Sequence, residues 1–125
     1  MNLEIDQLTE QIIGAGIEVH RELGPGLLES AYQRALAYEL RLRGVAFEEQ
    51  KLCPIKYKDL VIDDAYRLDF LVAGMVVVEL KTVDALLDVH DAQVLTYLKF
   101  TGCHIGLLLN LRSTVLTRGL RRLAL

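Results

Sequence analysis

The sequence predicts an α/β fold in which helices flank a central mixed β-sheet. Two amphipathic helical segments open the chain, three strand-like segments follow, and a further helix precedes two more strands. Clustered strands followed by a helix and another strand fit a mixed sheet with helices packed on its faces. The chain has 125 residues, enough for one domain with one core, so we expect a single domain over residues 1–125.

The first two helices follow from apolar residues at helical spacing. We expect the first from about Gln7 to Leu23, where the "GPG" at 24–26 ends it. We expect the second from about Leu28 to Arg43, with Gly44 in the usual position after a helix.

The middle of the chain predicts three strands. "FEEQKLCPIKY" (Phe47–Tyr57) is the first, with an irregularity expected at Pro54. We interpret "KDLVIDD" as a turn region. "AYRLDFLV" and "MVVVELKT" then form two strands around a turn at Ala73-Gly74.

A third helix and two strands complete the chain. The helix spans about Val89 to Thr101, with Asp88 as its N-cap and Gly102 as its terminator. "CHIGLLLN" is a short apolar run suited to a buried strand. "GLRRLAL" is expected to form the last strand.

Composition narrows the class of protein. Hydrophobic residues make up 52% of the chain, yet no apolar run approaches the roughly 20 residues that cross a bilayer. The acidic, polar N-terminus is unlike a signal peptide, and Cys53 and Cys103 have no metal-ligand spacing, so we expect reduced core thiols in an intracellular, cytoplasmic protein without a membrane partner. The net charge of −3 argues against purely electrostatic nucleic-acid binding. Four arginines gather after Leu111, and we favour a charged edge strand over a phosphate-binding strip; they are Arg112, Arg118, Arg121 and Arg122.

Two charged residues interrupt the apolar run "MVVVELKT". Because side chains alternate along a strand, Glu79 and Lys81 share the face opposite the apolar one. Asp69 on the preceding strand joins them only if antiparallel partners have residue numbers with an even sum. A two-residue turn at Ala73-Gly74 gives an odd sum, whereas a three-residue turn with Gly74 in the left-handed conformation, or a bulge, gives an even one. We expect the even register.

Two adjacent carboxylates repel each other unless a positive charge lies between them. Mg²⁺ supplies that charge, prefers a few carboxylates plus waters, and leaves positions open for phosphate oxygens. Lys81 beside them would orient or deprotonate a water, or stabilise charge on the phosphorus. The alternative is an exposed ion pair of Lys81 with Glu79 or Asp69, which contributes about 0–1 kcal/mol.

These positions carry a resemblance. Asp69 followed by "ELK" at 79–81 resembles the PD-(D/E)XK nuclease signature, and "GLLESAY" at 26–32 is similar to the motif that names the GxxExxY proteins. The resemblance runs from about Ile12 to Leu125, through "IEVHRELGPGLLESAY", "LDFLV", "VVVELKTVDAL" and "HDAQVLTYLKFTG". It implies a restriction-endonuclease-like core of αβββαβ order.

The resemblance also implies a site. Asp69 and Glu79 would bind Mg²⁺ or Mn²⁺ together with Glu29 of the second helix, and Lys81 would be the catalytic lysine. Taken alone, Glu29 is equally well explained as a first-turn carboxylate favoured by the helix dipole, but the company of Asp69 and Glu79 favours the site role. We also expect four residues to contact substrate. Gln93 and Tyr97 match the QxxxY motif of the RecB-like branch. Tyr32 belongs to the GxxExxY motif, and His90 lies on the same helix side as Gln93 and Tyr97.

The function expected on these grounds is metal-dependent cleavage of nucleic-acid phosphodiesters, with DNA as the preferred hypothesis. Two alternatives stay open: a non-catalytic interaction module on a nuclease-like fold, and a metal-dependent enzyme acting on a small phosphorylated ligand. A chain this short gains grip on a duplex from a second copy, so a homodimer is a further hypothesis.

Overall fold

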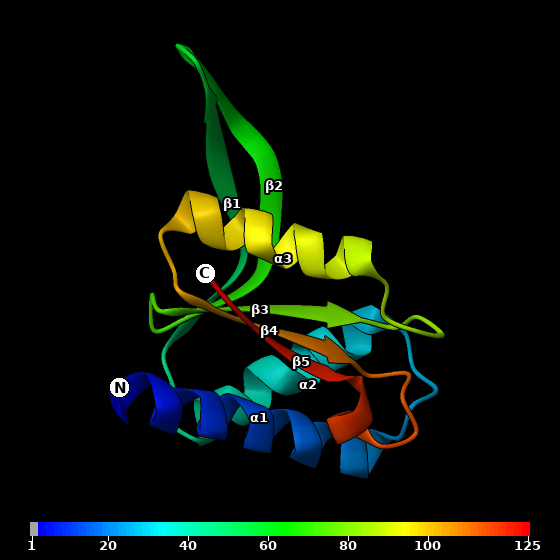
Figure 1. Ribbon diagram of the computed structural model, residues 1–125. Helices are drawn as coiled ribbons and strands as arrows, with labels where there is room; N and C mark the ends of the chain where they lie inside the picture. The colour runs from blue at the N-terminus through cyan, green and yellow to red at the C-terminus, as the bar shows by residue number, and fades with distance from the viewer. Residues whose placement is uncertain (1–2) are drawn as a thin grey trace.

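The computed structural model describes residues 3–125. Within this range the elements follow the predicted α-α-β-β-β-α-β-β order (Figure 1); they are α1 (Leu3–Leu23), α2 (Glu29–Leu42), β1 (Phe47–Tyr57), β2 (Leu60–Val72), β3 (Val76–Lys81), α3 (Asp88–Thr101), β4 (Ile105–Asn110), the 3₁₀ helix η1 (Leu116–Gly119) and β5 (Leu120–Ala124). In the described range, none of the helices is long and apolar enough to cross a membrane.

The strands form a mixed sheet in the order β1-β2-β3-β4-β5. Strands β3 and β4 run parallel because α3 carries the chain back between them, and the other neighbours are antiparallel. Helices α1 and α2 cover one face of the sheet and α3 covers the other (Figure 1). The predicted fold class, a mixed sheet flanked by helices, is confirmed.

Side-chain alternation along the strands divides the core into two layers. The layer under α1 and α2 contains buried side chains of these helices, such as Ile12 and Leu36. It also contains side chains from the sheet face that they cover, such as Phe70, Val78 and Leu107. The layer under α3 holds the opposite faces, among them Leu68, Val77, Val94, Leu98 and Leu108. Because both faces are covered, β3 and β4 are almost continuously apolar.

The expectation of a turn region at "KDLVIDD" is wrong. The turn comprises Lys58 and Asp59, and β2 begins at Leu60. Lys58 has φ 52°, which lets a short turn close a hairpin between two long strands. Acidic residues within this stretch suggested a loop, but they lie on an exposed two-stranded ribbon where both faces contact solvent. This ribbon extends beyond α3 (Figure 1).

Three smaller expectations are also corrected. Helix α1 begins at Leu3, earlier than Gln7. The N-cap of α3 is Leu87, and Asp88 is the first helical residue. The 3₁₀ helix η1 precedes the last strand, where the sequence offered no clear periodic pattern.

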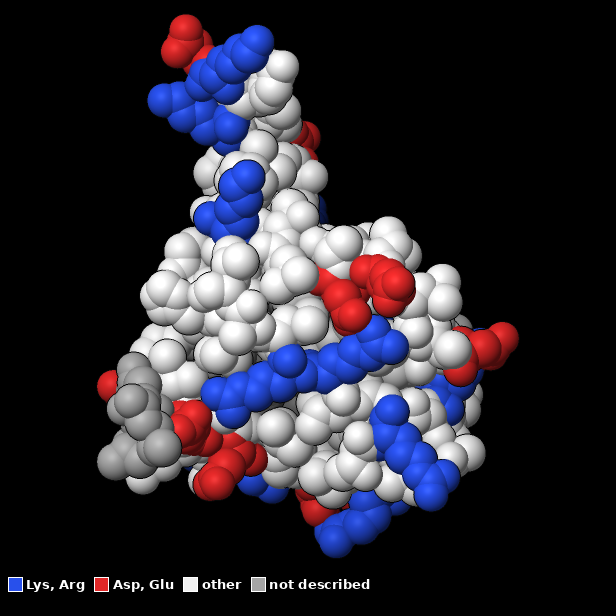
Figure 2. Space-filling model, in the orientation of Figure 1, with Lys and Arg blue, Asp and Glu red and all other residues white. Residues whose placement is uncertain are grey.

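The C-terminal arginines lie in or near β5, an edge strand. Arg121 pairs with Asp91 at 2.6 Å, and Arg122 pairs with Asp6 at 3.2 Å. Figure 2 shows basic side chains lying beside acidic ones across this face. Since the charges of Arg112, Arg121 and Arg122 are matched by neighbouring carboxylates, the arrangement supports the charged edge strand over a phosphate-binding strip.

Candidate active site

The turn between β2 and β3 sets the register of the site. Phe70 pairs with Val78, so partner numbers have an even sum, as expected. The turn has three residues, Ala73–Met75, and the first two adopt positive φ of 52° and 66°. Continued in this register, Asp69 lies opposite Glu79.

Asp69 and Glu79 each accept a hydrogen bond from a backbone N–H group on the strand that carries the other. The Asp69 N–H donates to Glu79 Oε1 at 3.1 Å, and the Leu80 N–H donates to Asp69 Oδ2 at 2.8 Å. These bonds form at the point where β2 leaves β3 and continues with β1 as the ribbon. Each carboxylate is therefore held by a backbone donor of the facing strand, at the opening of the sheet.

The electrostatics of this pair are strained. Glu79 is 6% exposed. Burial and then the charge of Asp69 raise its pKa to about 9, against the lowering effects of the Asp69 N–H and of Lys81. At neutral pH Glu79 therefore keeps its proton.

Lys81 does not neutralise the acids. Its Nζ donates to Gln93 Oε1 on α3 at 3.2 Å. In residues 3–125 it forms no ion pair with a carboxylate, so the alternative of a Lys81–Glu79 or Lys81–Asp69 ion pair is not found. Gln93 from α3 holds the ammonium beside the acids while leaving its charge unpaired.

Tyr97 combines packing with proximity to the acids. Its ring stacks on Tyr66, with centroids 4.5 Å apart and planes at 5°. Its pKa is raised by partial burial, then by the charges of Glu79 and Asp69. The ring thus belongs to the layer under α3, and its hydroxyl lies within the field of the acidic pair.

Glu29 approaches from α2, whose first residue it is. Its pKa is raised by burial, then by the charge of Asp69, and lowered by Lys81. Asp69 on β2 therefore interacts electrostatically with Glu29 of α2 and with Glu79 of β3. In the described part of the chain, however, no group of three or more His, Cys, Asp or Glu side chains is arranged to hold a metal ion. Metal ligation by Glu29, Asp69 and Glu79 stays a prediction.

Tyr32 is buried in the core, and its predicted contact with substrate stays a prediction. It is 1% exposed and lies in the layer under α1 and α2. Its hydroxyl donates to the Gly24 carbonyl and accepts from the Leu27 N–H. The tyrosine of "GLLESAY" therefore anchors the loop that precedes α2, and through that loop it helps to place Glu29.

One ring nitrogen of His90 makes a structural hydrogen bond. Its Nδ1 accepts the Leu87 N–H at 2.9 Å, at the start of α3. A substrate contact through its other nitrogen stays a prediction.

Sequence reasoning missed three polar residues around the site. Gln33 and Gln50 contact Asp69 directly. Asn110 is buried, and its side chain binds both the N–H and the carbonyl of Val83, which fixes the chain just after Lys81. Gln33 lies four residues after Glu29 and thus on the same helix face, a signal that could have found it. No pattern marks Gln50 or Asn110.

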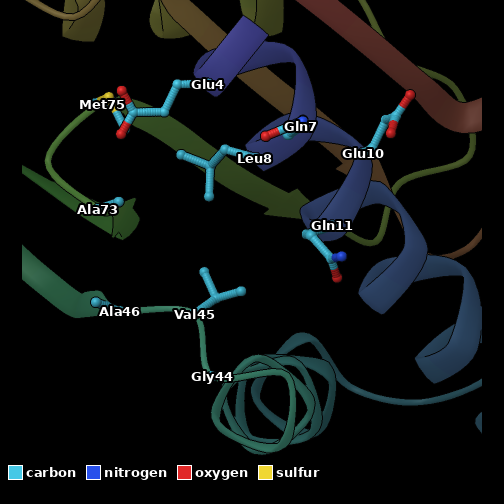
Figure 3. A pocket seen from close by; sticks show the side chains of 10 residues that line it. All are labelled: Glu4, Gln7, Leu8, Glu10, Gln11, Gly44, Val45, Ala46, Ala73 and Met75. Atoms are coloured by element: carbon cyan, nitrogen blue, oxygen red, sulfur yellow. The ribbon is translucent and has the colours of Figure 1, made fainter.

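A surface hollow of about 580 Å³ lies away from these residues. Helix α1, the connection from α2 to β1 and the β2–β3 turn surround it (Figure 3). Glu4 and Glu10 contribute carboxylates to its lining, and none of the lining residues belongs to the acidic site. A phosphorylated ligand gains nothing from such a lining, so this hollow does not support the small-ligand alternative.

Comparisons with known proteins agree with the topology. A family model described as the PD-(D/E)XK nuclease superfamily matches residues 6–123. No curated protein and no solved structure matches the chain.

Proposed function

The chain belongs to the PD-(D/E)XK nuclease superfamily, and we propose that it is a divalent-metal-dependent nuclease that hydrolyses phosphodiester bonds of nucleic acid. The motifs further support a place among the GxxExxY proteins, in the RecB-like branch, with DNA as substrate and Mg²⁺ or Mn²⁺ as cofactor. Asp69 supplies the acid of the first signature element, and Glu79 and Lys81 supply the second.

One observation carries the proposal: the carboxylates of Asp69 and Glu79 face each other where β2 leaves β3, and each accepts a hydrogen bond from a backbone N–H group of the facing strand. Burial and then the charge of Asp69 raise the pKa of Glu79 to about 9, so a negative charge on Glu79 is unfavourable there. Carboxylate oxygens are the ligands that Mg²⁺ and Mn²⁺ prefer, so the donor set fits such an ion. A bound divalent ion would neutralise both acids and polarise a phosphoryl oxygen.

The protein's own groups then have distinct tasks. Asp69 and Glu79 keep fixed orientations through the backbone donors of the facing strand. Lys81, held by Gln93, presents an unpaired ammonium to a phosphate and would stabilise the charge that develops on it. Glu29 approaches from α2 and adds negative charge that a cation would offset.

A cleavage assay tests the proposal. Single- and double-stranded DNA and RNA are incubated with Mg²⁺, Mn²⁺ or EDTA, using wild type, Lys81→Ala and the matched control Lys99→Ala. Lys99 lies exposed on α3, over the Phe100 ring. We expect metal-dependent cleavage that Lys81→Ala lowers by about 10²–10³-fold and Lys99→Ala leaves unchanged.

The outcomes separate the alternatives. Cleavage of no nucleic acid, with no effect of Mn²⁺ on thermal unfolding, would favour the non-catalytic interaction module. Metal binding without cleavage of any polymer would favour a small phosphorylated substrate. The homodimer is tested separately, by measuring the mass in solution with and without a duplex.

A further inference from the structure

Gln50 has an unusual backbone in the middle of β1. Its φ is 48°, in the left-handed region that residues other than glycine seldom adopt. Its neighbours keep the regular ladder with β2, since Glu49 pairs with Phe70 and Lys51 pairs with Leu68. Gln50 is thus the residue opposite Asp69, at the one place between these pairs where the ladder is interrupted.

The side chain of Gln50 contacts the acidic site directly. Its Nε2 donates to Asp69 Oδ1 at 3.2 Å and to Gln33 Oε1 at 3.3 Å. Both amide hydrogens are therefore used. Because a carboxylate oxygen accepts hydrogen bonds and the amide nitrogen donates them, the orientation of this amide is determined.

Asp69 is held at both oxygens as a result. Oδ2 accepts the Leu80 N–H of β3, and Oδ1 accepts the Gln50 amide of β1. Each carboxylate oxygen has two lone pairs, so each keeps one for a further partner. The two bonds pull from opposite sides and fix the rotation of the carboxylate about its Cβ–Cγ bond.

Gln33 links this arrangement to α2. Its Nε2 donates to the Asp69 carbonyl at 3.3 Å and to Glu49 Oε1 at 3.4 Å, while its Oε1 accepts from Gln50. Gln33 and Glu29 share one helix face. The amide pair therefore joins β1, β2 and α2 around one carboxylate.

We propose that Gln50 is a positioning residue for metal binding: it turns the free lone pairs of Asp69 toward the cation position, and β1 keeps its left-handed backbone for this purpose. The inference rests on the proposed function. Backbone strain that persists beside a site is a recognised sign of a functional constraint, and partners of metal ligands commonly tune affinity without touching the metal.

Gln50→Gly separates this role from a structural one. Glycine adopts a φ of 48° without strain and lacks the amide. We expect the metal-free variant to unfold at the same temperature as wild type or above it. We expect its affinity for Mn²⁺, measured by calorimetry, to fall by about 10–100-fold. The kcat should fall with it, and the KM for the nucleic acid at saturating Mn²⁺ should stay unchanged.

Lys58→Gly is the matched control. Lys58 has a φ of 52°, is exposed at the far turn of the ribbon and makes no contact with the site acids in the described residues. The same relief of backbone strain there should leave Mn²⁺ affinity and kcat unchanged.

Three results would overturn the inference. If Gln50→Gly binds Mn²⁺ and cleaves as wild type does, Gln50 does not position Asp69, and the proposed function stands. If the metal-free variant unfolds at a lower temperature than wild type, its role is structural. If wild type itself shows neither Mn²⁺ binding nor cleavage, the proposed function fails and the inference fails with it.

Discussion

Glu79→Gln removes one charge from the acidic pair while keeping its shape. The glutamine carbonyl still accepts the Asp69 N–H, as Glu79 Oε1 does at 3.1 Å. The amide nitrogen can donate to Asp69, which is what the protonated carboxyl does. The variant therefore imitates the neutral state of Glu79 at every pH.

The size of the effect follows from the pKa shift. The pKa of Glu79 is about 9 in the fold, against an ordinary value of 4.5. Between these values the folded protein holds a proton that the unfolded chain has released, so wild-type stability falls as pH rises through this window. At about 1.36 kcal/mol per pH unit, the free energy of unfolding of wild type falls by about 3 kcal/mol between pH 4.5 and pH 7.

We therefore expect metal-free Glu79→Gln to be more stable than wild type at pH 7, with a melting temperature higher by about 10 °C. The difference should vanish near pH 4.5 and grow toward pH 9. Thermal melts in EDTA across this range measure it, with Glu10→Gln on the exposed side of α1 as the control. A stability difference that does not change with pH would refute the reasoning.

Divalent metal should offset most of this difference in stability. A cation that binds the folded wild type stabilises it by about 2.7 kcal/mol at one hundred times its dissociation constant. The variant lacks one anionic ligand, so we expect little shift with Mn²⁺. A shift as large as that of wild type would show that Glu79 is not a ligand.

Three further predictions follow from single contacts. Tyr32→Phe should lower the free energy of unfolding in urea by about 1–3 kcal/mol, because the Gly24 carbonyl and Leu27 N–H lose their partner, and it should leave substrate KM unchanged. Arg121→Ala should cost about 1 kcal/mol through the lost bonds to Asp91 and the Leu86 carbonyl, without weakening nucleic-acid binding in a fluorescence-anisotropy titration. Glu29→Gln should weaken Mn²⁺ binding in calorimetry by about tenfold while changing metal-free stability by less than about 0.5 kcal/mol; unchanged affinity would mean that Glu29 acts as a helix-terminal charge alone.

Much of the fold could be predicted because local patterns and tertiary structure agree. The helices have apolar residues at helical spacing and end at glycines, and β3 and β4 are apolar because both faces are covered. The register of the β2–β3 hairpin followed from the parity of Asp69 and Glu79, since a buried face tolerates no slip by one residue.

The rest depends on long-range partners that a single sequence does not reveal. Residues 58–64 look like a loop, but the exposed ribbon tolerates polar residues on a strand. Tyr32 belongs to a motif that also contains Glu29, and sequence alone does not show that one side chain points into the core and the other toward the acids. Gln50 lies 19 residues from Asp69, and a hydrogen bond across that separation leaves no periodic trace.

The acidic pair also explains why the sheet can open where it does. A strand that leaves its neighbour exposes backbone N–H groups, and a buried donor without a partner is costly. Here the Asp69 and Leu80 N–H groups are satisfied by the carboxylates of Glu79 and Asp69. The same oxygens that make the opening stable are those that a cation would bind. Alanine at either position would therefore remove a backbone acceptor together with a charge, whereas the amide variants keep the acceptor. For this reason, amide substitutions separate the chemistry of the site from the stability of the fold.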